Sequence, residues 1–349
     1  MARPIEIDLV SDTSTRPGRA MLEAMTTAPV GDEQRGEDPT VIALNERVAA
    51  MLGMEAALFL PSGTMCNQIA FVVHCRPGDE IIVADSAHVF GSEGAGASTF
   101  AGAQFRTVDA PRGIFDAAAV TAALRTPRMR RPRSRVVCVE QPTNRGGGAV
   151  WPVETLDAVC AVGHEAGLAT HMDGARLLNA VVATGVSAER FCAGLDSAWI
   201  DLSKGLGCPV GGVLAGSAAF IEAAWDWKHR MGGAMRQAGV LAAAGLYALD
   251  HNVDRLAEDH ANAKILAARL SALEGVAIVP PEVETNMVFI DVAATRTTAP
   301  AIAAALQEEG IRMGVESPTT LRAVTHLDVD RAGVERAADV VAAHLASRS

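Results

Sequence analysis

The chain has 349 residues, 49% of them hydrophobic, which is enough to bury one large core and a second, smaller one. Its 30 Lys and Arg residues against 41 Asp and Glu residues give a formal net charge of −11, and no basic stripe is long enough to follow a phosphate backbone, so nucleic acid is not expected as a partner. No apolar stretch approaches the roughly 18 to 20 residues that cross a bilayer, so no membrane span is expected.

Short apolar runs alternate with helical segments from about residue 39 to residue 215, which predicts strand–helix–strand crossovers around a mostly parallel sheet. The first helix is well delimited, because Asp38 suits its cap, Pro39 suits its first turn and Gly53 follows its last apolar residue. The segment Arg125–Arg133, rich in Arg and Pro, is predicted to be an exposed loop. The predicted strands, which suit one sheet covered by helices on both faces, are Ala56–Leu60, Glu80–Ala84, Phe105–Asp109, Arg135–Glu140, Leu168–Asp173, Ala198–Leu202 and Gly212–Ala215.

The C-terminal part of the chain predicts a second, smaller α/β unit. Three helices and two strands are expected there: helices near Leu256–Leu273, Pro300–Glu309 and Arg331–Ala346, and strands at Met287–Val292 and Leu321–Thr325. The predicted fold class is therefore α/β, with a mostly parallel seven-stranded sheet between helices and a smaller C-terminal α/β domain. The expected boundaries are a large domain over residues 16–250 and a small domain over residues 251–349.

The cysteines indicate a reducing compartment. They show no C-x-x-C pair and mostly lie in apolar runs: Cys66, Cys75, Cys138, Cys160, Cys192 and Cys208. We expect free, buried thiols, with neither a metal site nor a disulfide framework. The N-terminal Met-Ala-Arg-Pro-Ile-Glu-Ile-Asp lacks the apolar region of a secretory signal, so the predicted location is the cytoplasm.

Four short polar segments follow predicted strands, and in a doubly wound sheet ligands bind at the carboxyl ends of the strands. The first is Pro61-Ser62-Gly63-Thr64, which opens a predicted helix. Backbone N–H groups at a helix N-terminus bind anions such as phosphate, although ordinary helix capping is the commoner reason for such a turn.

The second and third segments contain Asp173 and Lys204. In His171-Met172-Asp173-Gly174-Ala175-Arg176 a carboxylate ends an apolar strand, where it either keeps a ring nitrogen protonated or only caps the next helix. In Ser203-Lys204-Gly205 a lysine stands between apolar runs; because burying an ammonium is costly, it either reaches water or has a function. A desolvated amine suits Schiff-base chemistry, and the presence of both residues one strand apart strengthens both functional interpretations.

The fourth segment, Asp85-Ser86-Ala87-His88, ends in an imidazole. A histidine at this place can stack on a flat cofactor ring or move protons, since its ordinary pKa is near neutrality. A lone histidine after a strand is more often only a polar loop residue. The single tyrosine, Tyr247, falls in a helical run away from these strand ends, so a tyrosine does not easily take either role.

Seven segments together resemble a known family. They are Asp8-Leu9-Val10-Ser11-Asp12-Thr13, Gly36-Glu37-Asp38-Pro39-Thr40, Pro61-Ser62-Gly63-Thr64-Met65, His171-Met172-Asp173-Gly174-Ala175-Arg176, Ser203-Lys204-Gly205-Leu206-Gly207, Gly232-Gly233-Ala234-Met235-Arg236-Gln237 and Leu321-Arg322-Ala323-Val324-Thr325-His326-Leu327-Asp328. Over essentially its whole length the chain resembles the low-specificity L-threonine aldolases of the β-eliminating lyase group, which are fold type I pyridoxal 5'-phosphate (PLP) enzymes.

The resemblance implies a cofactor site for PLP. In it Lys204 forms the Schiff base, Asp173 pairs with the ring nitrogen and His88 stacks on the ring, and these three are the expected catalytic residues. The other cofactor contacts that the resemblance implies are those of Ser62, Gly63, Thr64, Arg176 and, across a subunit interface, Arg236.

The resemblance also implies the reaction and the assembly. The reaction is a reversible retro-aldol cleavage of a β-hydroxy-α-amino acid, such as L-threonine, L-allo-threonine or phenylserine, to glycine and an aldehyde. The N-terminal segment 1–15 contributes to the active site, and the chain forms a homodimer or homotetramer with shared active sites. The substrate residues that it implies are Ser11, Arg35, Thr143, Arg176 and Arg322, with both Arg176 and Arg322 on the substrate carboxylate.

Three positions depart from the family pattern. Arg35 stands where members usually have Tyr, Thr143 where they have a His near the substrate hydroxyl, and Val10 where they have Arg. A smaller side chain at Thr143 is expected to favour a bulkier substituent or another donor, and it leaves His88 or an ordered water as the base. The alternatives are another PLP-dependent elimination, racemisation or glycyl transfer on the same scaffold, or a scaffold that has lost catalysis. A nicotinamide enzyme is disfavoured because no G-x-G-x-x-G turn follows an early strand.

Overall fold

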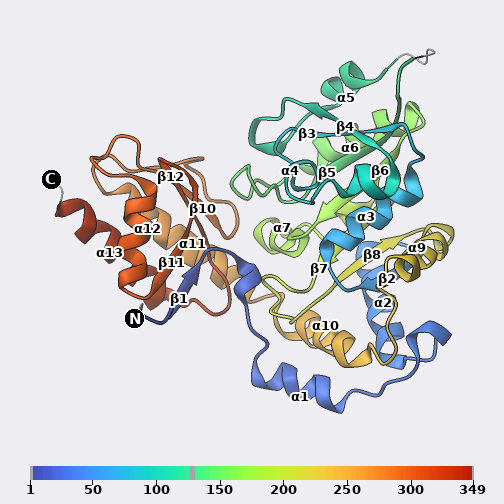
Figure 1. Ribbon diagram of the computed structural model, residues 1–349, viewed down its shortest axis with the longest axis horizontal. Coiled ribbons are helices and arrows are strands. Elements are labelled where there is room, and N and C mark those ends of the chain that lie inside the picture. Colours follow the sequence, from blue (N-terminus) through green and yellow to red (C-terminus); the bar gives the residue numbers. More distant parts are fainter. Residues whose placement is uncertain (1–2, 126–129, 348–349) are drawn as a thin grey trace.

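The larger of two sheets confirms the predicted seven-stranded architecture. The computed structural model describes residues 3–125 and 130–347, and Figure 1 shows them as two lobes of unequal size. In the larger lobe the strand order is β2-β8-β7-β6-β5-β3-β4, and all strands run parallel except β8, which is antiparallel to β2 and β7. The strands are β2 (Ala56–Leu60), β3 (Asp79–Ala84), β4 (Gln104–Val108), β5 (Arg133–Glu140), β6 (Ala169–Gly174), β7 (Ser197–Asp201) and β8 (Gly212–Gly216).

Helices cover both faces of this sheet. Successive side chains of a strand point to opposite faces, so Leu58 and Leu214 pack with α3 and α9 while Phe59 and Val213 pack with α2. Each such buried apolar side chain stabilises the fold by roughly 1.5–3 kcal/mol. The helices of this lobe are α1 (Arg19–Thr27), α2 (Pro39–Leu52), α3 (Gly63–His74), α4 (His88–Gly91), α5 (Ala117–Ala123), α6 (Val153–Glu165), α7 (Leu177–Thr184), α8 (Ala188–Cys192), α9 (Ala218–Arg230) and α10 (Gly239–His251).

The predicted caps of α2 are confirmed. Asp38 Oδ1 accepts hydrogen bonds from the backbone N–H groups of Thr40 and Val41, at 3.1 and 3.0 Å. At the other end Gly53 adopts a left-handed conformation with φ of 65°, which a glycine takes without strain.

The smaller lobe contains a mixed five-stranded sheet of order β1-β11-β12-β10-β9. Figure 1 shows both chain ends here, with the blue N-terminal strand β1 beside the orange-red β11, to which it pairs in parallel. Only two of these strands were predicted, because β1 and β9 are too short for a recognisable alternation and β11 contains exposed polar residues. The elements are β1 (Ile7–Leu9), α11 (Leu256–Ser271), β9 (Ala277–Ile278), β10 (Met287–Asp291), α12 (Ala299–Glu308), β11 (Ile311–Ser317), β12 (Thr320–Val324) and α13 (Arg331–Ala346).

Two predicted boundaries fall at the start of β5 and at the end of α10. The predicted loop Arg125–Arg133 lies partly outside the described residues. Its predicted end is wrong, because Arg133 is already the first residue of β5 and pairs with Asp79 of β3. The predicted division between residues 250 and 251 falls at the end of α10 and stays a prediction. No helix in the described part of the chain is both long and apolar enough to cross a membrane.

Candidate active site

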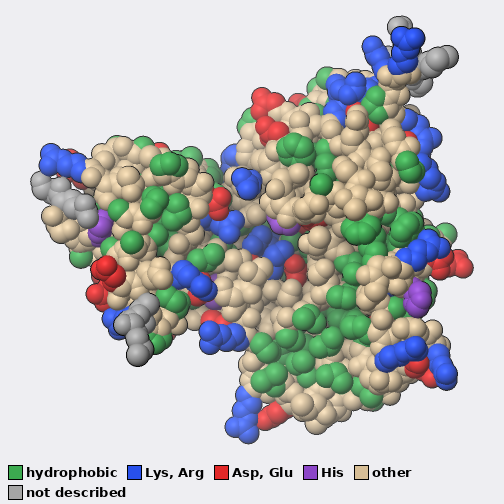
Figure 2. Space-filling model, viewed as in Figure 1, with side chains coloured by type: hydrophobic (Ala, Val, Ile, Leu, Met, Phe, Trp, Pro, Cys, Tyr) green, Lys and Arg blue, Asp and Glu red, His purple; other side chains and the backbone are tan. Residues whose placement is uncertain are grey.

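The carboxyl ends of β5, β6 and β7 open into a cavity of about 440 Å³. Figure 2 shows it as a hollow between the two lobes, in which Lys and Arg side chains gather. A larger and more open hollow of about 740 Å³ lies at the opposite end of the sheet, around His74 and His164, and it contains none of the predicted residues. Nine predicted residues line the first cavity: Ser11, Ser62, Gly63, Thr64, His88, Asp173, Arg176, Lys204 and Arg322.

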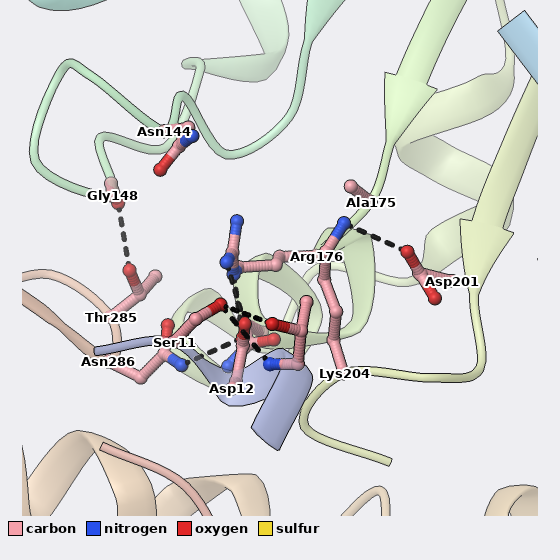
Figure 3. Close-up of polar contacts among 12 residues, drawn as sticks. Ser11, Asp12, Asn144, Gly148, Ala175, Arg176, Asp201, Lys204, Thr285 and Asn286 are labelled. Carbon is pink, nitrogen blue, oxygen red and sulfur yellow. Dashed lines mark hydrogen bonds and ion pairs between the residues drawn. The ribbon is translucent and has the colours of Figure 1, made fainter. Parts of the chain in front are cut away.

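The amine of Lys204 is held at one side of this cavity. Its Nζ lies 2.8 Å from Asp201 Oδ2, and its side chain is only 17% exposed. Asp201 is the last residue of β7, and its Oδ1 accepts from the backbone N–H and the hydroxyl of Ser203 at 2.8 and 2.9 Å. The turn after β7 therefore positions the amine, as Figure 3 shows for the Lys204 side chain and Asp201.

Asp173 presents a buried carboxylate at the end of β6. It is 2% exposed, and its two oxygens accept from Asn67 Nδ2 at 2.9 Å and from the Ala175 backbone N–H at 3.1 Å. Neither donor is charged, and within residues 3–125 and 130–347 no cation forms an ion pair with it. Because an unpaired buried carboxylate is costly, the site fits a ligand that brings a positive charge.

His88 begins α4, directly after β3 and its turn. Its Nδ1 lies 3.0 Å from Oε1 of Glu93, whose side chain is 1% exposed. This hydrogen bond raises the pKa of His88, against the effect of burial. Sequence reasoning missed Glu93, because nothing in its loop separates it from an ordinary surface acid.

Arg176 is fixed by Asp12 in a buried, bidentate ion pair. Its Nε and Nη2 donate to the two oxygens of Asp12, both at 2.7 Å, and Asn286 Nδ2 approaches the same carboxylate at 3.3 Å. Burial acts to raise the pKa of Asp12, but the charge and hydrogen bonds of Arg176 lower it to about 2. Figure 3 shows Asp12 between Arg176 and Asn286.

Arg322 approaches the cavity from β12 of the smaller lobe. Its Nη1 donates to Asn144 Oδ1 and its Nη2 to the Val10 carbonyl, each at 3.2 Å. Its Nε lies 3.3 Å from Glu316 Oε1 but makes no hydrogen bond, so it is a buried donor without an acceptor. A carboxylate ligand would supply that acceptor.

The Ser62–Thr64 turn stands at the N-terminus of α3. The Ser62 hydroxyl accepts from the Met65 N–H at 3.3 Å and caps the helix. A Cβ at Gly63 would lie 2.1 Å from the Trp199 ring, so only glycine fits there. The N-terminus of α3 therefore lies at the cavity wall, where backbone N–H groups suit an anion.

A second buried acid, missed by sequence reasoning, ends β5. Glu140 lies beside Asp173 in the strand register and lines the cavity. Burial, and then the charge of Asp173, raise the pKa of Glu140 to about 7. It can therefore exchange a proton near neutral pH.

Three predicted residues do not line the cavity. Thr143 is buried, and its hydroxyl donates to the Arg112 carbonyl at 2.8 Å, while its neighbours Asn144 and Arg145 form the cavity wall. The side chains of Arg35 and Arg236 are 72% and 61% exposed, and both lie near Asp32. Their roles stay predictions.

His88, Glu93 and Asp173 also bring ligand atoms within 4.8 Å of one another, as a metal site would. The Nδ2 group of Asn67, however, donates to both carboxylates of this group, at 2.8 and 2.9 Å. Since amide hydrogens already point at these oxygens, the arrangement is better suited to hydrogen bonding than to a cation.

Comparison with known proteins agrees with this geometry. The family model described as beta-eliminating lyase matches residues 8–294. The chain is 43% identical to the low specificity L-threonine aldolase of Escherichia coli (strain K12), with 96% of this chain and 97% of the relative covered. It is 42% identical to low-specificity L-threonine aldolase 1 of Arabidopsis thaliana, with 94% and 93% covered.

A solved structure shows the same fold. The threonine aldolase of Leishmania major superposes with a TM-score of 0.84 at 21% identity, with 97% of this chain and 99% of that chain covered. The family match spans most of the chain, and both sequence relatives align over nearly their whole length. The chain therefore belongs to the beta-eliminating lyase family.

Proposed function

We propose that this chain is a PLP-dependent aldehyde-lyase that cleaves a β-hydroxy-α-amino acid reversibly to glycine and an aldehyde. L-threonine, L-allo-threonine or a bulkier analogue such as L-phenylserine is the proposed substrate. The observation that carries the proposal is a single cavity that combines the amine of Lys204, the buried carboxylate of Asp173 without a cation, and the guanidinium groups of three arginines, Arg145, Arg176 and Arg322. The relatives above bear the name of this activity, and their family uses PLP.

The residues of the cavity fit PLP. Lys204 Nζ is the amine for its aldehyde, and Asp173 is the carboxylate for its ring nitrogen. Ser62, Gly63 and Thr64, which also line the cavity, are proposed to bind its phosphate through N–H groups, and His88 is proposed to stack on its ring. When bound, the cofactor supplies an electron sink for the bond that breaks at the substrate Cα.

Arg176 and Arg322 are proposed to bind the substrate carboxylate. The free Nε of Arg322 lacks an acceptor, and Asp12 holds Arg176 with its guanidinium plane fixed. Because Asp12 occupies Nε and Nη2 of Arg176, Nη1 is the nitrogen of Arg176 that remains for the substrate. Together with Nε of Arg322 it would fix the carboxylate, and so the direction of the Cα–Cβ bond. Ser11, which also lines the cavity, lies on the same side as Asp12 in Figure 3 and is proposed to contact the substrate.

His88 is proposed to take the proton of the β-hydroxyl, directly or through a water. Glu93 is an acceptor for Nδ1–H, so in the neutral imidazole the lone pair is on Nε2. The same contact keeps the ring from rotating, so Nε2 is the nitrogen that remains to take the proton. Return of this proton completes the reverse reaction, in which glycine and an aldehyde combine.

We further propose a homodimer or homotetramer with shared active sites, located in the cytoplasm. Four large hydrophobic side chains on and near α1, α2 and α10 are exposed, those of Leu22, Val30, Ile42 and Val240. Figure 2 shows hydrophobic side chains gathered on this part of the surface. The side chains of Arg35 and Arg236 lie outside the cavity of their own chain and are exposed. We propose that they contact the active site of a neighbouring chain. All six cysteines are free and buried, which is typical of a reducing compartment.

An absorbance spectrum, followed by addition of the three substrates with glycine and aldehyde assayed, tests the proposal. We expect a band near the visible edge that is lost in Lys204→Ala, together with release of glycine and aldehyde in equal amounts. The same band without aldehyde would overturn the aldolase reaction and leave β-elimination, racemisation or glycyl transfer, which the products would separate.

A further inference from the structure

Asn67, on α3 and fully buried, joins two carboxylates of the cavity. Its Nδ2 donates one hydrogen to Asp173 Oδ2 at 2.9 Å and the other to Glu93 Oε1 at 2.8 Å. Asp173 is the proposed partner of the cofactor ring, and Glu93 holds His88. One amide group therefore contacts both the carboxylate that is proposed to pair with the ring nitrogen and the carboxylate that holds the proposed base.

The orientation of this amide follows from its other neighbours. Trp199 Nε1 lies 2.7 Å from Asn67 Oδ1, and an indole N–H can only donate. The oxygen of the amide must therefore face Trp199, which leaves Nδ2 for the carboxylates. If the amide were flipped, its NH2 group would face the indole N–H of Trp199 and its oxygen would face the two carboxylates, so these contacts fix the orientation.

His171 supplies a second donor to the same oxygen. Its Nε2 lies 3.1 Å from Asn67 Oδ1, so Nε2 carries the hydrogen. Burial lowers the pKa of His171 to about 3, so the ring is neutral and its Nδ1 is an acceptor. Ser197 Oγ, at 2.8 Å from that Nδ1, then donates to it and accepts from His74 Nε2, also at 2.8 Å. The hydrogen bonds therefore all donate in one direction, from His74 through Ser197 and His171 to Asn67.

We propose that Asn67 is a positioning residue that holds Asp173 against the ring nitrogen of the cofactor, with Trp199 and His171 as its anchors. This inference rests on the proposed cofactor site. Asp173 has two hydrogen-bond donors in the described chain, and Asn67 is the one from a side chain. Without it the carboxylate keeps only the Ala175 N–H, which leaves Oδ2 unsatisfied and free to turn away from the ring.

The neighbouring residue provides a matched control. Gln68 is buried on the same helix, and its Nε2 donates to Glu93 Oε2 at 2.6 Å. It makes no hydrogen bond with Asp173. Gln68→Met therefore removes a buried amide donor from the Glu93 side alone, while Asn67→Leu, of similar shape, removes donors from both sides.

The test compares two cofactors in the full-length protein after the cofactor has been removed and titrated back. One is PLP, and the other is 1-deaza-PLP, whose ring has carbon in place of nitrogen and cannot be protonated there. We expect Asn67→Leu to raise the dissociation constant for PLP roughly ten- to hundredfold, as loss of a hydrogen bond to a charged group does, and that for 1-deaza-PLP less than about twofold. Gln68→Met should change both constants equally and little.

If Asn67→Leu weakens the binding of PLP and of 1-deaza-PLP equally, Asn67 has a merely structural role and the inference is overturned. The inference is also overturned if the binding of neither cofactor is weakened. If Asn67→Leu does not fold, His171→Phe removes one anchor of the amide and should show the same selective effect at smaller size; its absence there would also overturn the inference. A wild-type protein that binds PLP but releases no aldehyde would refute the proposed reaction without affecting this comparison.

Discussion

Replacing Asp12 by Asn isolates the charge of the ion pair that fixes Arg176. Asp12 is completely buried, and Arg176 is 8% exposed. Asp12→Asn keeps the size of the side chain but leaves the guanidinium charge buried without a counter-charge. Breaking a buried ion pair on one side costs about 3–5 kcal/mol, and the retained amide oxygen places the expected loss near the lower end.

This loss converts to a shift in Tm. At about 2.1 cal/mol/K per residue, a chain of this length has an unfolding entropy of roughly 0.7 kcal/mol/K, so a loss of about 3 kcal/mol lowers Tm by about 4 °C. The matched control is Asp157→Asn, since Asp157 also forms a bidentate pair with an arginine, Arg190, but both side chains are nearly half exposed. An exposed pair contributes less than about 1 kcal/mol, so this Tm should fall by no more than about 1.5 °C.

The pH dependence supplies the decisive measurement. Because the pKa of Asp12 is lowered from 3.8 to about 2, its stabilisation is present above pH 4 and is lost as the pH falls from 4 towards 2. Thermal unfolding followed between pH 6 and pH 3 should therefore show the gap between wild type and Asp12→Asn closing on acidification. Equal losses in Asp12→Asn and Asp157→Asn, or a gap that does not depend on pH, would refute the reasoning.

Three further predictions concern the cavity. Glu93→Gln should move the acidic limb of the pH profile of kcat/KM to lower pH, because Glu93 raises the pKa of His88, whose neutral form is the proposed base; an unmoved limb would exclude His88. Glu140→Gln should raise Tm of the cofactor-free protein at pH 8 but not at pH 4, since the wild-type acid, with its pKa raised from 4.5 to about 7, loses its contribution as the pH rises through 7; a difference independent of pH would contradict this. Arg145 is the one Lys or Arg on the described cavity wall without a carboxylate in ion-pair distance, so Arg145→Glu should raise KM several-fold with kcat little changed, and less so at high salt; equal KM values would count against it.

The strands of the large sheet could be predicted because parallel strands buried on both faces are short, continuous apolar runs. The site residues at their ends followed from the same argument, since the carboxyl ends of such strands meet at one edge. β1 could not be predicted, because three residues show no period and its pairing partner is β11, about 300 residues away. The sequence of a single strand predicts it poorly when the strand is stabilised mainly by contacts with its partner strand.

The partners of the site residues were harder to predict than the residues themselves. Asp201 precedes Lys204 by three residues, so local spacing could have suggested the contact. Asn67, in contrast, stands beside Gln68 in an otherwise mostly apolar helix, and nothing in the local sequence shows that its amide contacts Asp173. Glu93 and Glu140 become distinctive only through burial, which depends on tertiary packing and cannot be read from local sequence.

The N-terminal segment connects the two arginines that are proposed to bind the substrate carboxylate. Asp12 holds Arg176 of the large lobe, and the Val10 carbonyl accepts from Arg322 of the small lobe. β1, just before them, is a strand of the small sheet, and Thr15, just after them, donates to the Lys204 carbonyl at 2.8 Å. The spacing of the two guanidinium groups is therefore set by a few residues attached to both lobes. We therefore expect this segment to keep the two arginines at a fixed spacing for the proposed carboxylate ligand, although they belong to different lobes.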